Sequence, residues 1–113
     1  MTDLLVERRD GVVEVTFNRP EKHNAFTQAM YGSMHELCDS LAEDESVKVL
    51  VLRGAGGRAF AAGNEISDFL SQDAVAYEDW IRSLLDKLFA LPQVTVAAVD
   101  GVCVGGGLAV ASH

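Results

Sequence analysis

Apolar and polar residues alternate at the start of the chain in a way that predicts two strands. We expect the first strand over Leu4–Arg8 and the second over Val12–Phe17, where valine and phenylalanine alternate with polar residues. Asp10-Gly11 lies between them, and Asp-Gly is a strong signal for a two-residue hairpin turn. The chain is therefore expected to open with a β-hairpin that has one buried face.

Two later segments carry apolar residues at helical spacing. The first helix is expected over Thr27–Ala42, with the Thr27 side chain as its N-cap, and the second over Ala74–Ala90. Pro20–Ala25, before the first helix, is typical of a loop. We also expect a short helical turn over 66–70 and a further helix that begins at Leu108.

Two continuous apolar runs predict central strands. They are Val47–Arg53 and Val94–Val99, and such runs are typical of strands that are buried on both faces. After the opening hairpin, strands and helices then alternate along the chain. This order predicts an α/β fold with largely parallel central strands.

Composition and charge argue against nucleic acid and anionic membranes as binding partners. The chain has 113 residues, enough for one small domain, and 17 acidic against 9 basic residues give a net charge of −8. Nonspecific binding to nucleic acid or to an anionic membrane needs a basic face, so we expect neither partner. No secretory signal or membrane-spanning run is apparent, so we expect a cytoplasmic protein. The two cysteines lack metal-ligand spacing, and no metal site is predicted.

Two loops rich in glycine and alanine follow the two apolar runs. The first covers Gly54–Asn64 and the second Gly101–Gly107. In α/β sheets, sites lie outside the carboxyl ends of the strands, and small side chains let a ligand approach the backbone closely. Because the second loop leads into the expected helix, its amides would lie at a helix N-terminus. Amides from the two loops could converge on one developing negative charge, which is the geometry of an oxyanion hole.

These glycines also allow other interpretations. The second loop lacks the Lys and the Ser or Thr of a P-loop, and neither loop has the G-x-G-x-x-G pattern of dinucleotide-binding folds. The glycines could also serve only to allow close packing of strand and helix. From the loops alone, this structural interpretation is as well supported as an oxyanion hole.

Three ordered motifs bear a family resemblance. Asn18–Phe26 resembles the N-R-P-x-x-x-N-A-[FL] segment of the enoyl-CoA hydratase/isomerase family, the crotonases. Ala59–Ile66 is similar to that family's A-F-x-A-G-x-D-[IL] segment, and Val96–Gly107 to its A-A-V-x-G-x-x-x-G-G-G segment. The resemblance thus extends over nearly the whole chain.

The resemblance implies a fold and an assembly. The fold is α/β, a crotonase-like spiral of β-β-α units, of which residues 1–113 would be the N-terminal part of a single domain. A full crotonase fold is more than twice this length, and the chain stops at Ala111–His113, inside an apolar stretch, so we expect it to be an incomplete portion. A full-length relative would form a homotrimer or a hexamer.

The resemblance also implies a substrate and the residues that bind it. The substrate is an acyl-CoA thioester whose carbonyl lies between the backbone amides of Asn64 and Gly106, the same two loops that the glycine pattern selects. An enolate formed at the α-carbon is then stabilised. Lys22 and His23 lie in the segment that borders the CoA in relatives. No cofactor is expected, because CoA is part of the substrate. The other expected substrate-binding residues are Ala25, Ala62, Gly63, Glu65 and Ile66.

Departures from the family pattern leave the reaction open. Hydratases of the family carry a catalytic Glu where this chain has Ala109, and alanine cannot transfer a proton. The second catalytic acid of the family would lie beyond His113. Ala109 therefore favours isomerase or other enolate chemistry over hydratase chemistry. It also keeps open a catalytically silent protein that binds CoA thioesters, or a non-functional truncated fragment.

Several residues have a plain structural interpretation. Glu65, where the family usually has Asp, more often makes a local hydrogen bond than transfers a proton. His23 is expected in a solvated loop and His35 on the solvated surface of the first helix. Cys103 lies near the expected site but has no base beside it in the sequence, so we expect a small buried filler.

Overall fold

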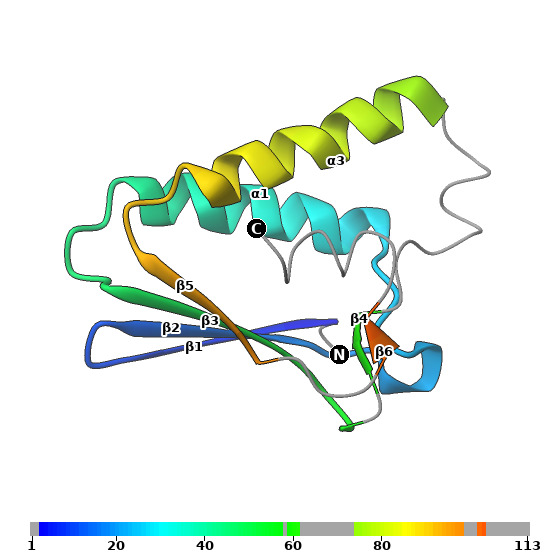
Figure 1. Ribbon diagram of the computed structural model, residues 1–113, viewed down its shortest axis with the longest axis horizontal. Coiled ribbons are helices and arrows are strands. Elements are labelled where there is room, and N and C mark those ends of the chain that lie inside the picture. The colour runs from blue at the N-terminus through cyan, green and yellow to red at the C-terminus, as the bar shows by residue number, and fades with distance from the viewer. Residues whose placement is uncertain (1–2, 58, 62–73, 99–101, 104–113) are drawn as a thin grey trace.

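The computed structural model describes residues 3–57, 59–61, 74–98 and 102–103 (Figure 1). Within these residues the predicted alternation of strands and helices is confirmed. The expected helical turn over 66–70 and the helix from Leu108 lie outside them.

The elements in chain order are β1 (Leu4–Arg9), β2 (Val12–Phe17), the 3₁₀ helix η1 (Pro20–Lys22), α1 (Gln28–Ala42), β3 (Val49–Gly54), β4 (Ala59–Ala61), α3 (Ala74–Phe89), β5 (Val94–Ala98) and β6 (Val102–Cys103).

Four strands form the main sheet, in the order β1-β2-β3-β5. β1 and β2 pair antiparallel, whereas β2 pairs with β3, and β3 with β5, in parallel. Asp10 and Gly11 both have positive φ, at 50° and 80°, as the hairpin between β1 and β2 requires. The predicted α/β fold with parallel central strands is therefore present.

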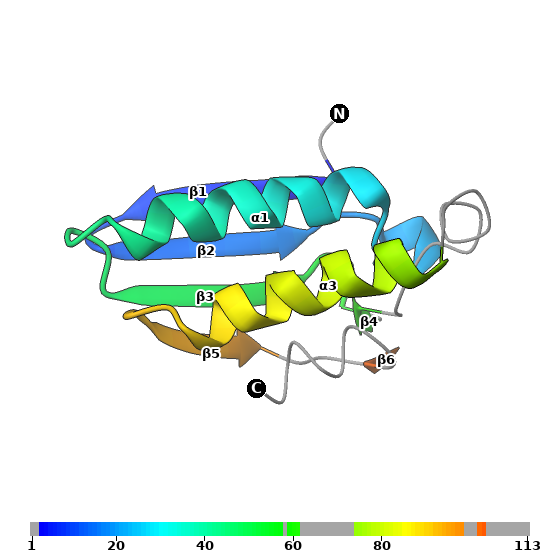
Figure 2. The same cartoon turned by 90° about the horizontal axis from the view of Figure 1, so that it is seen from above.

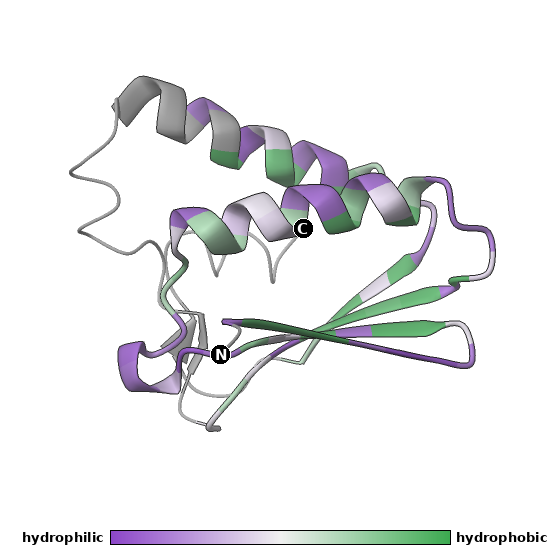
Figure 3. Ribbon diagram, turned by 180° about the vertical axis from the view of Figure 1, so that it is seen from behind, coloured by the Kyte–Doolittle hydropathy of each residue, from purple (hydrophilic) through white to green (hydrophobic). Residues whose placement is uncertain are grey.

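Both helices cover the same face of this sheet. From above, α1 lies over β1 and β2, and α3 lies over β3 and β5 (Figure 2). In Figure 3 the strands carry apolar stretches, although much of β1 is hydrophilic, and apolar and polar residues alternate around α1. The core lies between the sheet and the helices, and Val13, Val15, Phe17, Leu50 and Leu52 are its fully buried strand residues.

The prediction that two strands are buried on both faces is wrong for the residues that the structure describes. In β3, Leu50 and Leu52 are buried, but Arg53 on the opposite face is exposed. In β5, Val94 and Val96 are 65% and 46% exposed. The reason is that α1 and α3 cover only one face of the sheet.

The expectation for His35 is also wrong. His35 is buried, at 9% exposure, because α1 packs against α3 as well as against the sheet. The buried surface of α1 therefore includes Tyr31, His35 and Cys38 beside the methionines and leucines that the helical spacing identified.

Neither helix in the described part of the chain combines the length and the apolar character that a bilayer crossing requires.

Candidate functional site

The carboxyl ends of the parallel strands define the candidate site. β2, β3 and β5 run in the same direction, so the segments that follow them meet at one edge of the sheet. η1 follows β2, and β4 and β6 lie in the loops after β3 and β5. Figure 1 shows η1, β4 and β6 gathered at this end of the molecule.

A short pair of strands joins the two glycine-rich loops. β4 pairs with β6 in parallel, with Ala59 opposite Val102 and Ala61 opposite Cys103. The sequence predicted continuous loops here, because strands of three and two residues give too short a pattern to detect. The pairing brings side by side two segments that are more than 40 positions apart in the sequence. This juxtaposition is the first requirement for a site built from both loops.

Most predicted site residues lie outside the described residues. These are Asn64 and Gly106, which were predicted to supply the oxyanion-hole amides, and the predicted substrate-binding residues Ala62, Gly63, Glu65 and Ile66. Asn64 and Gly106 each follow the last paired residue of β4 or β6 by three positions. Their roles stay predictions.

Ala25 is the predicted substrate-binding residue that the structure describes, and it is buried at 8% exposure. Its carbonyl oxygen accepts a hydrogen bond of 2.7 Å from Nη1 of Arg19. The next residue, Phe26, packs edge-to-face against Phe17 and Tyr31, with ring centroids 4.7 and 5.0 Å apart. Ala25 is thus held between a buried guanidinium group and the aromatic part of the core.

Asn24 organises the turn that carries η1. It is fully buried, has a φ of 59°, and its backbone N–H donates to the carbonyl of Arg19 at 2.8 Å. Its Oδ1 accepts from the backbone N–H of Arg19 at 2.8 Å. Its Nδ2 donates to the carbonyl of Ala55 in the first glycine-rich loop, at 3.1 Å. No role for Asn24 is predicted from its sequence position, although an asparagine beside a histidine in a turn is a signal for left-handed backbone.

Gly56 brings the first loop against η1. Its φ is +86°, and a Cβ on it would lie 2.8 Å from Cβ of Pro20. No other residue fits this contact without moving the loop. The N–H of Ala55 also donates to the carbonyl of Phe17, at 2.9 Å. The start of the first glycine-rich loop is therefore attached to the segment after β2.

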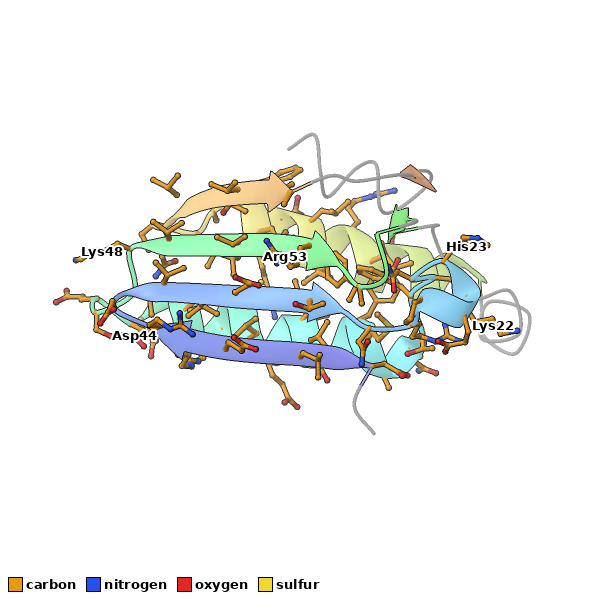
Figure 4. The ribbon with its side chains drawn as sticks, turned by 90° about the horizontal axis from the view of Figure 1, so that it is seen from below. Lys22, His23, Asp44, Lys48 and Arg53 are labelled. Carbon is orange, nitrogen blue, oxygen red and sulfur yellow. The ribbon has the colours of Figure 1, made fainter. Side chains whose placement is uncertain are left out.

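Lys22 and His23 are exposed at this edge of the sheet. His23 follows η1 with a φ of 52°, which turns the chain back toward the core. Figure 4 shows both side chains at one end of the sheet, with Asp44 and Lys48 at the other. The expectation of a solvated His23 is confirmed.

Hollows lined by described residues occur at the opposite edge of the sheet. One, of about 360 Å³, is lined by Ala42, Asp44, Glu45, Val47, Lys48, Pro92 and Gln93. The pKa of Asp44 is lowered, first by a hydrogen bond from the Ser46 hydroxyl and then by one from the Ser46 backbone N–H. These groups adjoin the amino ends of β3 and β5, away from both glycine-rich loops. Among the described residues, no three His, Cys, Asp or Glu side chains gather where they could hold a metal ion.

Comparison with known proteins decides the family. The sequence profile of the family described as enoyl-CoA hydratase/isomerase matches residues 7–113. The chain belongs to the enoyl-CoA hydratase/isomerase family. The resemblance carried by the three motifs is thereby confirmed, and so is the crotonase-like fold, of which the chain is a short N-terminal portion.

Individual relatives differ in their named reactions. The chain is 30% identical to 1,2-epoxyphenylacetyl-CoA isomerase of Escherichia coli over 118 residues, which cover 98% of the chain and 45% of the relative. It is 35% identical to hydroxycinnamoyl-CoA hydratase-lyase of Pseudomonas fluorescens over 113 residues, which cover 90% of the chain and 40% of the relative. An enoyl-CoA hydratase/isomerase structure from Marinobacter aquaeolei superposes with a TM-score of 0.89 at 26% identity, covering 96% of the chain and 45% of that structure. The chain therefore spans less than half the length of these relatives.

Proposed function

We propose that the protein is a crotonase-type enzyme that binds an acyl-CoA thioester and stabilises its enolate between two backbone amides. The amides are those of Asn64 and Gly106. The observation that carries the proposal is the pairing of β4 with β6, which places the two glycine-rich loops side by side. A chain of three residues spans at most about 11 Å, so covalent geometry keeps each amide near the paired strands.

The proposed chemistry needs few side chains from this part of the protein. When an α-proton leaves, negative charge moves onto the thioester oxygen, and two N–H donors aimed at that oxygen lower the energy of the transition state. Loss of one such donor typically costs about 2.7–4 kcal/mol. The acid or base that moves the proton would come from chain beyond residue 113.

CoA recognition involves the same edge of the sheet. We assign the CoA pocket to Ala25 with residues 62, 63, 65 and 66, largely through their backbone. Lys22 and His23 are exposed beside Ala25, and their position suits contact with the phosphates of CoA, which the net charge of −8 would otherwise repel. No separate cofactor is required, because CoA is part of the substrate.

The experiment uses the full-length polypeptide and a panel of enoyl-CoA esters in deuterated water. We expect turnover or incorporation of deuterium at the α-carbon with at least one ester. Double-bond migration would identify an isomerase and water addition a hydratase, and Ala109 favours migration. Absence of calorimetric binding to every ester in the panel would refute the proposal.

A second candidate is a catalytically silent protein that binds CoA thioesters. Ala109, at a position where hydratases of the family have a glutamate, is the observation that favours it. Binding without turnover and without α-proton exchange would support this candidate over the enzyme. Turnover of any ester would exclude it.

The assembly and the location are proposals of the same kind. We assign the full-length protein to a homotrimer or hexamer, which multi-angle light scattering measures directly. We assign it to the cytoplasm, and its net charge of −8 argues against a nucleic-acid or anionic-membrane partner. Cell fractionation tests the location.

A further inference from the structure

A buried side-chain amide links two segments that the proposed reaction depends on. Asn24 is 0% exposed, and its Nδ2 donates to the carbonyl of Ala55, 31 positions away in the sequence. Its Oδ1 accepts from the N–H of Arg19, which fixes the orientation of the amide. The hydrogen bond from Nδ2 therefore connects the turn after β2 to the first glycine-rich loop.

The connection is reinforced on both sides of the Ala55 carbonyl. The N–H of Ala55 donates to Phe17 at 2.9 Å, and Gly56 fits against Pro20 so closely that a Cβ would come within 2.8 Å of the ring. The turn itself is held by the bond from Arg19 to the carbonyl of Ala25. The loop thus leaves β3 from a fixed point.

The same loop is fixed a second time by β4. Four positions after Ala55, the chain enters β4, which pairs with β6 in the second glycine-rich loop. Three positions after β4 comes Asn64, the predicted oxyanion-hole donor. Asn24 and β6 are therefore two anchors on the path that leads to this amide.

We infer that Asn24 is a positioning residue, which holds the first glycine-rich loop so that the Asn64 and Gly106 amides address the same thioester oxygen. The inference rests on the proposed function. Asn24 itself does not contact the substrate. It acts through the carbonyl of Ala55 and the chain that follows.

Asn24→Asp removes the Nδ2 donor and keeps the size of the side chain, but it also buries a negative charge. Aspartate has the same shape, retains the acceptor for Arg19 and tolerates a φ of 59°. Its second oxygen would face the carbonyl of Ala55 and repel it. The loop should shift while the turn persists.

Gln93→Glu is the matched control. Gln93 is also a buried primary amide, and its Nε2 donates to the carbonyls of Leu41 and Asp44 at 2.7 and 3.3 Å. The substitution removes the same kind of donor and buries the same kind of charge. It does so at the opposite edge of the sheet, away from the glycine-rich loops.

The test measures kcat, KM and melting temperature of both variants in the full-length protein, with an ester that the wild type turns over. Since misplacement by about 1 Å can cost 100-fold in rate, we expect kcat of Asn24→Asp to fall about tenfold or more. An interaction made only in the transition state leaves KM within about twofold. Gln93→Glu should melt at a comparably lowered temperature and keep kcat within about twofold.

Two results would overturn the inference. One is an unchanged kcat for Asn24→Asp despite a lowered melting temperature. The other is an equal loss of kcat in Gln93→Glu, which would indicate a general effect of destabilisation. If Asn24→Asp fails to fold, Asn24→Gly is judged by the same criteria, because glycine adopts a φ of 59° freely, buries no charge and removes the hydrogen bond to Ala55.

If the protein turns over no ester, the proposed function is refuted. The role of Asn24 in holding the loop can then still be tested by hydrogen exchange. Hydrogen exchange then compares the amides of 55–64 with those of Val12–Phe17. We expect Asn24→Asp to accelerate exchange in 55–64 about tenfold or more and to leave β2 unchanged. Equal protection of the loop in variant and wild type would contradict the role of Asn24.

Discussion

Cys38 is the residue whose surroundings most clearly change its chemistry. The thiol lies in the core at 1% exposure, and burial raises its pKa from 9.0 to about 11. The charge of Lys87 lowers this pKa by a smaller amount, and the charge of Asp39 raises it slightly further. The folded protein therefore keeps this thiol protonated at a pH where the unfolded chain ionises it. Reactivity requires the thiolate, so Cys38 should be inert in the native state.

The raised pKa predicts a loss of stability in alkali. Below pH 9 both states hold the proton and Cys38 adds no pH dependence, whereas between pH 9 and about 11 only the unfolded state loses it. The free energy of unfolding should fall over this range by up to about 2.7 kcal/mol. Urea unfolding at several pH values checks this, and Cys38→Ala should flatten the decline. An unchanged slope in that variant would contradict the account.

Whereas Cys38 predicts a loss of stability in alkali, the lowered pKa of Asp44 predicts one in acid. Hydrogen bonds from Ser46 lower its pKa, so the carboxylate stabilises the fold above its ordinary pKa, and this is lost as pH falls through the lowered value. Ser46→Ala removes the hydroxyl, the largest cause, and should raise the pKa of Asp44. NMR titration of the carboxyl carbon measures it. Titration at the same pH in wild type and variant would argue against the Ser46 contact.

The start of α1 shows which element-scale features the sequence encodes locally. Thr27 has extended backbone, and its Oγ1 accepts from the N–H of Met30 at 3.1 Å, as the predicted N-cap should. The sulfur of Met30 accepts from the Thr27 N–H at 3.5 Å, in the place that a glutamate or glutamine takes in the usual capping box.

Thr27→Ala should lower the free energy of unfolding by about 1 kcal/mol, since it removes the acceptor for an otherwise unpaired helix N–H. Thr27→Ser keeps the hydroxyl and should retain most of the stability. Denaturant unfolding of the two variants makes the comparison. Equal losses in both would mean that the methyl group, not the cap, stabilises this end.

Local signals explain how much of the fold could be predicted. The hairpin, both helices and the parallel strands follow from short-range periodicity and turn residues. The β4–β6 pair could not be predicted, because its stability comes from partners more than 40 positions apart and its strands are too short for a pattern. The burial of His35 depends on where α3 packs, which the sequence of α1 does not contain. For the site, the motifs identified the loops, but the Asn24–Ala55 contact needed three-dimensional structure.

At the scale of the whole molecule, one face of the sheet remains uncovered in the described chain. Val94 and Val96 on β5 are exposed on this face, and so is Leu5 on β1. An apolar edge strand of this kind is a template for pairing with another chain. Because the chain spans less than half of its relatives, further polypeptide could cover this surface in a complete protein.

Residues 1–113 produced alone should therefore self-associate. Val96→Lys places a charge on the exposed face of β5 and should reduce the association. Because Val96 is 46% exposed, the substitution should leave the core unchanged. Light scattering over a range of concentrations measures the mass of the particles formed by the unchanged fragment and by the variant. A monodisperse monomer that melts cooperatively would show that the exposed strand has no such effect.

The central claim is that two glycine-rich loops, joined by β4 and β6, stabilise a thioester enolate. The most direct test is proton NMR of the full-length protein with acyl-CoA esters in deuterated water. The account predicts that the α-proton signal of at least one bound ester disappears at a rate proportional to protein concentration. Esters that bind and keep their α-protons would contradict it, and would indicate a protein that only binds CoA thioesters.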